Sequence, residues 1–151
     1  MVQVPYYEQE REYTCGPASA RMVLASVGVK RKEHHVAQVL HTKKQGTYDK
    51  YFLHLVKKYK LKCVYKRYGT LSALQKLQKE GYRIIISYYY SPEKVGHYAV
   101  LKKVGRKYVY LLDPWLGPEH KYSISYFKKV WGWKYCAQPD KNVYWFFAVK
   151  K

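Results

Sequence analysis

The residue best placed to do chemistry is Cys15, which stands directly before a run of helix-forming residues. The chain reads Thr14-Cys15-Gly16-Pro17-Ala18 at this point. Proline suits the first turn of a helix, because its missing N–H would have no partner there. A thiol at this end of a helix lies near unpaired backbone N–H groups and the positive end of the helix dipole, and both favour the thiolate. Since the thiolate is the nucleophilic form, this position predicts a reactive cysteine.

A nucleophilic cysteine needs a base, and the base needs an acceptor that orients it. His97 begins an apolar strand-like run, and Asp113 ends the next such run 16 residues later. If the two runs form a hairpin around Gly105, their outer ends meet and His97 becomes a neighbour of Asp113. An acid that ends an apolar strand is a costly placement unless a partner pairs with it. The pattern therefore predicts a nucleophile, a base and an orienting acid.

The other two cysteines are predicted to be small buried apolar residues. Cys63 lies in an alternating strand-like run, and Cys136 lies beside the aromatic run WGWKYC. Three cysteines, no Cys-x-x-Cys pair and no secretion signal argue against a disulfide framework and a structural zinc site. We therefore expect no metal and no cofactor. Of the remaining histidines, His34, His35 and His41 are expected on solvated positions. His54 is expected to be partly buried on the third helix, and His120 is expected in a loop after Pro118.

The elements that must position these residues change character along the chain. Helical spacing of apolar residues predicts three helices in the first half, over 17–27, 32–40 and 48–60. Alternating or strand-like apolar runs predict strands over 61–68, 83–89, 97–103, 108–112 and 144–149, with helices over 71–80 and 123–130 between them. Helices first and strands mostly last indicate an α+β fold with a largely antiparallel sheet. Without a linker or repeat, residues 1–151 are expected to form a single domain.

Four sequence elements in this order carry a family resemblance: Gln9, the run CGPA at 15–18, Gly96-His97-Tyr98, and Asp113-Pro114. The set resembles the C39 peptidase family, a papain-like group of cysteine peptidases that includes the leader-cleaving domains of bacteriocin exporters. The resemblance extends from Val4 to about Leu116. It implies a papain-like fold, with amino-terminal helices packed on a largely antiparallel sheet.

The resemblance also implies a role for each site residue. Cys15 corresponds to the nucleophile that forms a thioester, and His97 to the general base and acid. Asp113 corresponds to the acceptor that fixes the imidazole tautomer. Gln9, six residues before the cysteine, corresponds to the glutamine whose side-chain amide stabilises the oxyanion beside the backbone N–H of Cys15. The implied activity is hydrolysis of peptide bonds in a peptide or protein substrate.

Other functions stay open on the sequence alone. Exporter enzymes of the family are fused to membrane and ATPase domains, so cleavage of double-glycine leaders does not carry over. Papain-like folds also host acyl transfer, amidase chemistry and inactive binding domains. A catalytically inactive C39-like binding module for an acidic peptide or a nucleic acid is therefore the alternative.

The charge of the chain bears on its partners. The 151 residues carry a formal net charge of +19, which favours the approach of acidic substrates or partners. Bases and aromatics interleave over residues 57–68, as in grooves for single-stranded nucleic acid, but no nucleic-acid-binding signature accompanies them. Aromatic residues make up 18%, which argues against disorder. Without a membrane-spanning run or signal peptide, we expect a cytoplasmic protein.

Overall fold

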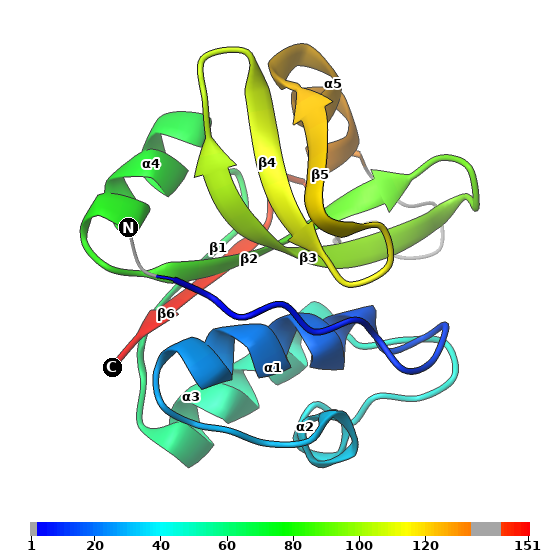
Figure 1. Cartoon of the computed structure of the whole chain (residues 1–151), viewed down its shortest axis with the longest axis vertical. Helices are drawn as coiled ribbons and strands as arrows, with labels where there is room; N and C mark the ends of the chain where they lie inside the picture. The colour runs from blue at the N-terminus through cyan, green and yellow to red at the C-terminus, as the bar shows by residue number, and fades with distance from the viewer. Residues whose placement is uncertain (1–2, 134–142) are drawn as a thin grey trace.

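The computed structural model describes residues 3–133 and 143–151, and its centre is a six-stranded sheet (Figure 1). The strand order is β1-β6-β2-β3-β4-β5, and every neighbouring pair is antiparallel. The strands are β1 (Lys62–Lys66), β2 (Arg83–Tyr90), β3 (Val95–Val104), β4 (Tyr108–Asp113), β5 (Gly117–Ser123) and β6 (Phe146–Lys150). The helices are α1 (Cys15–Ser26), α2 (Glu33–Val39), α3 (Leu53–Tyr59), α4 (Leu71–Lys79) and α5 (Ile124–Trp131). The predicted α+β class with an antiparallel sheet is confirmed.

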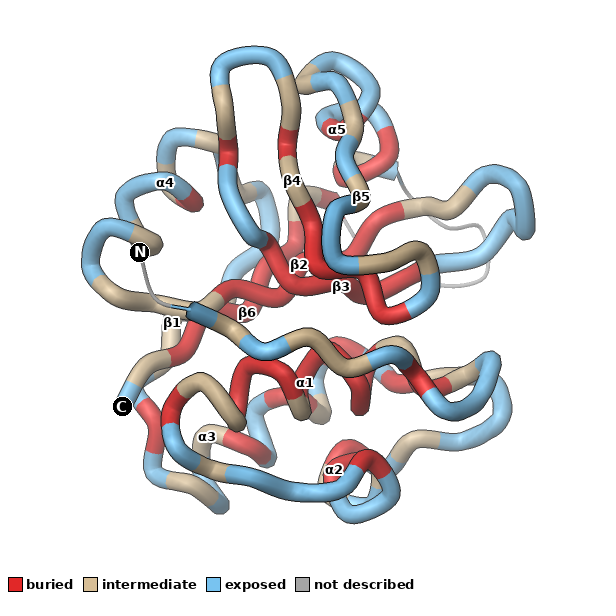
Figure 2. The backbone as a smooth tube through the Cα atoms, in the orientation of Figure 1, coloured by how far each residue is buried: buried red, intermediate tan, exposed pale blue. Residues whose placement is uncertain are grey.

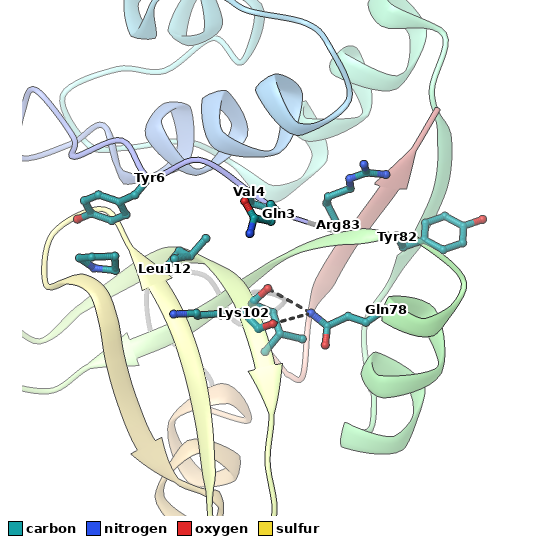
Figure 3. A pocket seen from close by; sticks show the side chains of 10 residues that line it. Gln3, Val4, Tyr6, Gln78, Tyr82, Arg83, Lys102 and Leu112 are labelled. Carbon is teal, nitrogen blue, oxygen red and sulfur yellow. Dashed lines mark hydrogen bonds between the residues drawn. The ribbon is translucent and has the colours of Figure 1, made fainter. Parts of the chain in front are cut away.

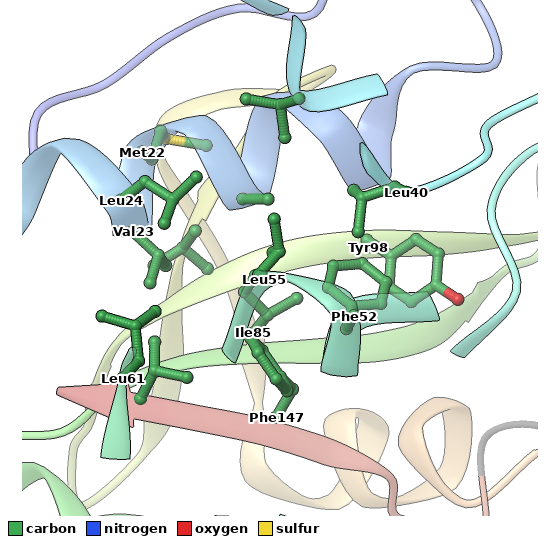
Figure 4. Packing of buried hydrophobic residues seen from close by; sticks show 14 of the residues in the cluster. Met22, Val23, Leu24, Leu40, Phe52, Leu55, Leu61, Ile85, Tyr98 and Phe147 are labelled. Atoms are coloured by element: carbon green, nitrogen blue, oxygen red, sulfur yellow. The ribbon is translucent and has the colours of Figure 1, made fainter. Parts of the chain in front are cut away.

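The sheet has a hydrophobic core on each face. On one face α1, α2 and α3 pack against side chains such as Ile85 and Phe147 (Figure 4). On the other face α4 and α5 pack against side chains such as Ile84 and Ile86. Successive side chains of a strand point to opposite faces, so one apolar run in β2 supplies both cores. The sheet is therefore covered by helices on both sides, as Figure 1 shows.

Helix α1 carries the candidate nucleophile and is buried along most of its length (Figure 2). It lies against β2, β3 and α2, and side chains such as Met22 and Val23 are at most 1% exposed. A helix that is apolar on nearly all sides is stable only when it is enclosed by other elements. Gly28 ends it with a φ of +89°, a left-handed conformation that glycine adopts without strain. This enclosure fixes the start of α1 relative to the sheet.

Three features differ from the sequence prediction. The helix expected over 48–60 is a 3₁₀ turn over Asp49–Phe52 followed by α3. Strand β5 was not predicted, because its sequence GPEHKYS contains a proline and lacks apolar alternation. It is an edge strand, where a proline is tolerated. Strand β6, the last in the sequence, lies inside the sheet between β1 and β2. Strands that are consecutive along the chain are more often neighbours in a sheet.

In the part of the chain that the structure describes, no helix is long and apolar enough to cross a membrane.

Candidate functional site

The hairpin of β3 and β4 brings His97 and Asp113 together. Val100 lies opposite Leu112 in this pair, so the beginning of β3 lies beside the end of β4. Nε2 of His97 is 2.6 Å from Oδ1 of Asp113. His97 is 6% exposed and Asp113 is fully buried. The meeting of these two side chains follows from the hairpin that the sequence predicts.

The Asp113 carboxylate accepts hydrogen bonds at both oxygens. Besides His97, the backbone N–H groups of Trp115 and Leu116 each donate to Oδ1 over 3.0 Å. The Tyr88 hydroxyl donates to Oδ2 over 2.6 Å. Burial by itself raises the pKa of Asp113, but the hydrogen bonds and the charge of His97 outweigh burial, and the pKa lies below its ordinary value. Asp113 is therefore an ionised carboxylate at neutral pH.

Cys15 is the first residue of α1 and is half-buried. The residue before it, Thr14, makes no side-chain cap to the helix, and the first turn contains no acidic residue. The Thr14 hydroxyl instead accepts from the Arg11 N–H over 3.0 Å and donates to the Arg11 carbonyl over 2.9 Å. A helix start with no anionic or side-chain cap is a favourable place for a thiolate.

Cys15 lies close enough to His97 to affect its pKa. Burial lowers the pKa of His97, but the negative charge of Cys15 and the interactions of the ring with Asp113 and Cys15 outweigh burial and raise this pKa to about 10. Because Nε2 is engaged by Asp113, Nδ1 is the ring nitrogen left for the thiol. The raised pKa favours the imidazolium form of His97 at neutral pH.

Gln9 lies close to this group but its amide is already engaged. Gln9 is 8% exposed, and its Nε2 donates to the carbonyls of Arg11 over 2.7 Å and Glu12 over 3.2 Å. Oε1 is buried and has no hydrogen-bond partner. The Gln9 backbone N–H donates to the carbonyl of Pro114 over 3.0 Å, which fastens this segment to the end of β4. To donate to an oxyanion, the Gln9 amide would therefore have to give up its longer hydrogen bond, the one to the Glu12 carbonyl.

A buried acid on α2 holds the loop between Gln9 and Cys15 from the other side. The Glu33 carboxylate accepts from the Glu10 backbone N–H, at 3.0 Å for Oε1 and 3.3 Å for Oε2. Burial raises the pKa of Glu33 above its ordinary value. The loop that contains the candidate oxyanion residue is therefore anchored to both β4 and α2.

Gly16 permits the close approach of α1 to the residues beneath it. A Cβ atom at this position would lie 2.8 Å from Oγ1 of Thr47 and 3.4 Å from Cδ2 of Tyr98. The Tyr98 hydroxyl donates to the Thr47 carbonyl over 2.9 Å and to the buried Asp49 carboxylate. The contact is rigid, because both neighbours are themselves hydrogen-bonded.

We expect Gly16→Ala to lower the free energy of unfolding by about 1–3 kcal/mol, through overpacking. At a helical position with free space the same change would stabilise by up to about 1 kcal/mol. Urea unfolding followed by circular dichroism measures the difference. Adding Thr47→Ala, which removes the closest atom, should restore part of the stability. A Gly16→Ala variant as stable as the wild type would contradict this account of the contact.

The other candidates lie elsewhere. Cys63, on β1, is half-buried, and burial raises its pKa to about 11. Cys136 lies outside the described residues. His34, His35, His41 and His54 are exposed, so the expectation of a partly buried His54 was wrong. His120, expected in a loop, lies on β5.

No metal centre is seen among residues 3–133 and 143–151, where no three His, Cys, Asp or Glu side chains group around one point.

A cavity of about 450 Å³ lies away from the reacting groups, among the amino-terminal segment, α4, β3 and β4 (Figure 3). Its lining includes Tyr6, Gln78 and Lys102, but neither Cys15 nor His97.

Tyr88 is the contributor to this site that sequence reasoning missed. It stands in a run of three tyrosines at the end of β2, a pattern that is typical of strand packing alone. The available signal was the alternation of side chains along the strand. Tyr88 lies on the same face as Ile84 and Ile86 and therefore points inward. Only the pairing of β2 with β3 shows that the inward neighbour is His97.

Solved structures with the same architecture are C39 peptidase domains. The peptidase domain of Streptococcus ComA, a bi-functional ABC transporter, has a TM-score of 0.74 at 18% identity, covering 97% of this chain and 96% of that chain. A protein described as a C39-like peptidase from Bacillus anthracis has a TM-score of 0.79 at 16% identity, covering 100% and 96%. A double glycine motif protease from an AMS/PCAT transporter, solved with the leader peptide, has a TM-score of 0.69 at 24% identity, covering 99% and 91%.

The comparison with curated proteins gave no match. The family comparison agrees with the fold, because the model of the Peptidase_C39 like family matches residues 1–138. This chain therefore belongs to the Peptidase_C39 like family, and its fold is that of C39 peptidase domains.

Proposed function

We propose that this protein is a cysteine peptidase that hydrolyses peptide bonds through a thioester on Cys15. The observation that carries the proposal is the 2.6 Å contact between Nε2 of His97 and Asp113, in a ring whose pKa Cys15 also raises. Family membership and the start of α1 at Cys15 support the same assignment. Cys15, His97 and Asp113 would serve as the nucleophile, the base and the group that orients the base, which are the three roles that covalent catalysis requires.

The first half of the reaction follows from this geometry. The Cys15 thiolate attacks the carbonyl carbon of the scissile peptide bond, and the carbonyl oxygen becomes an oxyanion. The backbone N–H of Cys15 donates to this oxyanion. The Gln9 side-chain amide also donates to it once it has given up its hydrogen bond to the Glu12 carbonyl. The His97 imidazolium then gives its proton to the leaving amine, and the bond to nitrogen breaks to leave a thioester.

The second half regenerates the thiolate. His97, now neutral, takes a proton from water as the water oxygen attacks the thioester carbonyl. The carbon–sulfur bond breaks, the carboxylic acid product leaves, and the imidazolium faces the thiolate again. Asp113 accepts the hydrogen bond from Nε2 throughout, which keeps Nδ1 directed at the reacting atoms and stabilises the charged ring.

The substrate class is a peptide or protein. One solved relative, a double glycine motif protease, holds a leader peptide. The net charge of +19 favours the association of acidic segments over basic ones, with an on-rate that falls as salt is added. We therefore propose that peptides with acidic residues around the scissile bond are the better substrates.

A second candidate function has one observation in its favour. Both amide hydrogens of Gln9 are held by loop carbonyls, so the donor that the family resemblance assigns to the oxyanion is not free. A C39-like module that binds a peptide without cleaving it would tolerate this arrangement. Hydrolysis of a peptide library by the wild type favours the peptidase. Binding without hydrolysis, unchanged in Cys15→Ala, favours the binding module.

Alkylation tests the reactivity of the thiol independently of any substrate. With iodoacetamide at pH 6.5 we expect Cys15 to react at least about 100-fold faster than Cys63, because a thiol with a pKa of about 11 is almost wholly protonated there. Cys136 is also expected to react more slowly than Cys15. Peptide mass spectrometry assigns each site, with Cys15→Ser as the blank. Equal or slower labelling of Cys15 would refute an activated thiolate.

A further inference from the structure

Tyr88 lies fully buried at the point where the two catalytic candidates on the sheet meet. Tyr88 on β2 is paired directly with His97 on β3, and side chains paired in this way lie on the same face of the sheet. The two rings pack edge to face, with centroids 5.4 Å apart and an interplanar angle of 86°. The Tyr88 hydroxyl donates to Oδ2 of Asp113 over 2.6 Å. Tyr88 therefore contacts both His97 and Asp113.

The two oxygens of Asp113 are held in different ways. Oδ1 accepts from His97 and from two backbone N–H groups of the turn that follows, those of Trp115 and Leu116. Oδ2 accepts from Tyr88, a side chain on a strand that is not adjacent to β4 in the sheet. The terminal torsion of an aspartate is broad, so bonds at one oxygen leave the carboxylate able to pivot. The bond at Oδ2 supplies the second fixed point.

We propose that Tyr88 is a positioning residue of this site, which fixes the plane of the Asp113 carboxylate and through it the orientation of His97. The inference rests on the proposed function for its catalytic consequence, but the positioning itself is a property of the buried side chains. Tyr88 would act through Asp113, to which its hydroxyl donates.

A second tyrosine supports Tyr88 from β5. Tyr122 packs against Tyr88 with ring centroids 5.4 Å apart and an angle of 73°, and each residue affects the pKa of the other. His120, on the same strand, packs edge-on against Tyr122 at 4.5 Å.

Tyr88 stays in the donor form among the titratable groups that it contacts. These are His97 on β3, Asp113 on β4 and Tyr122 on β5. Burial and the negative charge of Asp113 both raise the pKa of Tyr88. Its hydroxyl therefore remains a donor over the whole range in which a peptidase assay is run.

The test is Tyr88→Phe, which removes the hydroxyl and keeps the buried ring. The matched control is Tyr6→Phe, because the Tyr6 hydroxyl donates over 2.7 Å to the same residue, but to the backbone carbonyl of Asp113. We expect Tyr88→Phe to lower kcat by about 10- to 100-fold, with KM within about twofold because a buried residue makes no substrate contact. The acid limb of the pH profile should move to higher pH, since loss of a donor raises the pKa of a carboxylate. Tyr6→Phe should leave that limb in place.

A spectroscopic readout separates this inference from the proposed function. The proton on Nε2 of His97, shared with Asp113, should give a downfield ¹H NMR signal that shifts in Tyr88→Phe and not in Tyr6→Phe. If the wild type hydrolyses no peptide but the signal shifts as expected, the peptidase proposal fails and the positioning role stands. If kcat, the acid limb and the His97 signal are all unchanged in Tyr88→Phe, the positioning role is refuted.

Tyr122→Phe provides a milder variant. It keeps the hydrogen bond from Tyr88 to Asp113 and removes the hydroxyl of the neighbouring ring. It should shift the His97 signal in the same direction as Tyr88→Phe, by a smaller amount. A signal at the wild-type position in Tyr122→Phe, together with a Tyr88→Phe variant that does not fold, would overturn the proposal.

Discussion

Cys15→Ala should abolish peptide hydrolysis, with kcat/KM reduced by at least about 1,000-fold, and should leave the protein folded. The substitution removes the sulfur that forms the thioester, and the alanine methyl group is not a nucleophile. Alanine is well tolerated at the first position of a helix, and Cys15 is only half-buried. Initial rates on a peptide substrate, together with far-UV circular dichroism, separate loss of chemistry from loss of fold.

Cys63→Ala is the control for this experiment. Cys63 is also half-buried and free, but it lies on β1 and packs against the core that contains α1. This variant should keep wild-type kcat/KM and lose only a small amount of stability. Hydrolysis that persists in Cys15→Ala and is lost in Cys63→Ala would contradict the assignment, because it would identify Cys63 as the nucleophile.

The second large effect is expected from Asp113→Ala, which should lower kcat/KM by about 100- to 10,000-fold. The variant leaves His97 without the acceptor that sets its tautomer and stabilises its charge. It also removes the Asp113 oxygens that accept from the Tyr88 hydroxyl and from two backbone N–H groups. Because each buried hydrogen bond that is lost in this way costs about 1–3 kcal/mol, we expect a stability loss of about 3 kcal/mol or more, measurable by urea unfolding.

Asp113→Asn separates the charge of Asp113 from its role as an acceptor. The amide oxygen can still accept from Nε2 of His97, so this variant should lose less activity than Asp113→Ala. Removal of the negative charge should lower the pKa of His97, which Asp113 helps to raise. The alkaline limb of kcat/KM, expected near pH 10 in the wild type, should therefore move to lower pH. A limb at the same pH in Asp113→Asn would contradict the coupling.

The same pKa shift has a defined sign in stability. His97 has a raised pKa in the folded state, so its interactions contribute stability that is fully present below its ordinary pKa of about 6.5. That contribution is lost as the pH rises toward about 10. Asp113 has a lowered pKa, and its contribution is present above its ordinary range and is lost as the pH falls through the folded value. Both contributions are fully present between the ordinary pKa of an aspartate, about 4, and that of a histidine, about 6.5.

The parts of the site that could be predicted from sequence are those fixed by local geometry. The hairpin around Gly105 needs only alternation and a tight turn, and it is enough to bring His97 to Asp113. The start of a helix at Cys15 follows from Pro17 and the apolar run behind it. These features depend on residues close together along the chain.

The parts that could not be predicted depend on contacts between distant segments. The bond from Tyr88 to Asp113 requires β2 to pair with β3 in one register, and a shift by one residue would turn the hydroxyl to the other face. The amide of Gln9 could be placed near the site by its spacing, but its bonds to Arg11 and Glu12 are set by the loop conformation. The insertion of β6 between β1 and β2 likewise requires strand pairing across the whole chain.

The most direct test of the central claim is to trap the covalent intermediate. Wild-type protein is mixed with a library of peptide nitrophenyl esters, quenched in acid after a short time and measured by intact mass spectrometry, followed by peptide mapping. The account predicts an acyl adduct on Cys15 that hydroxylamine removes and that Cys15→Ala does not form. Hydrolysis without any adduct, or an adduct mapped to another residue, would contradict it.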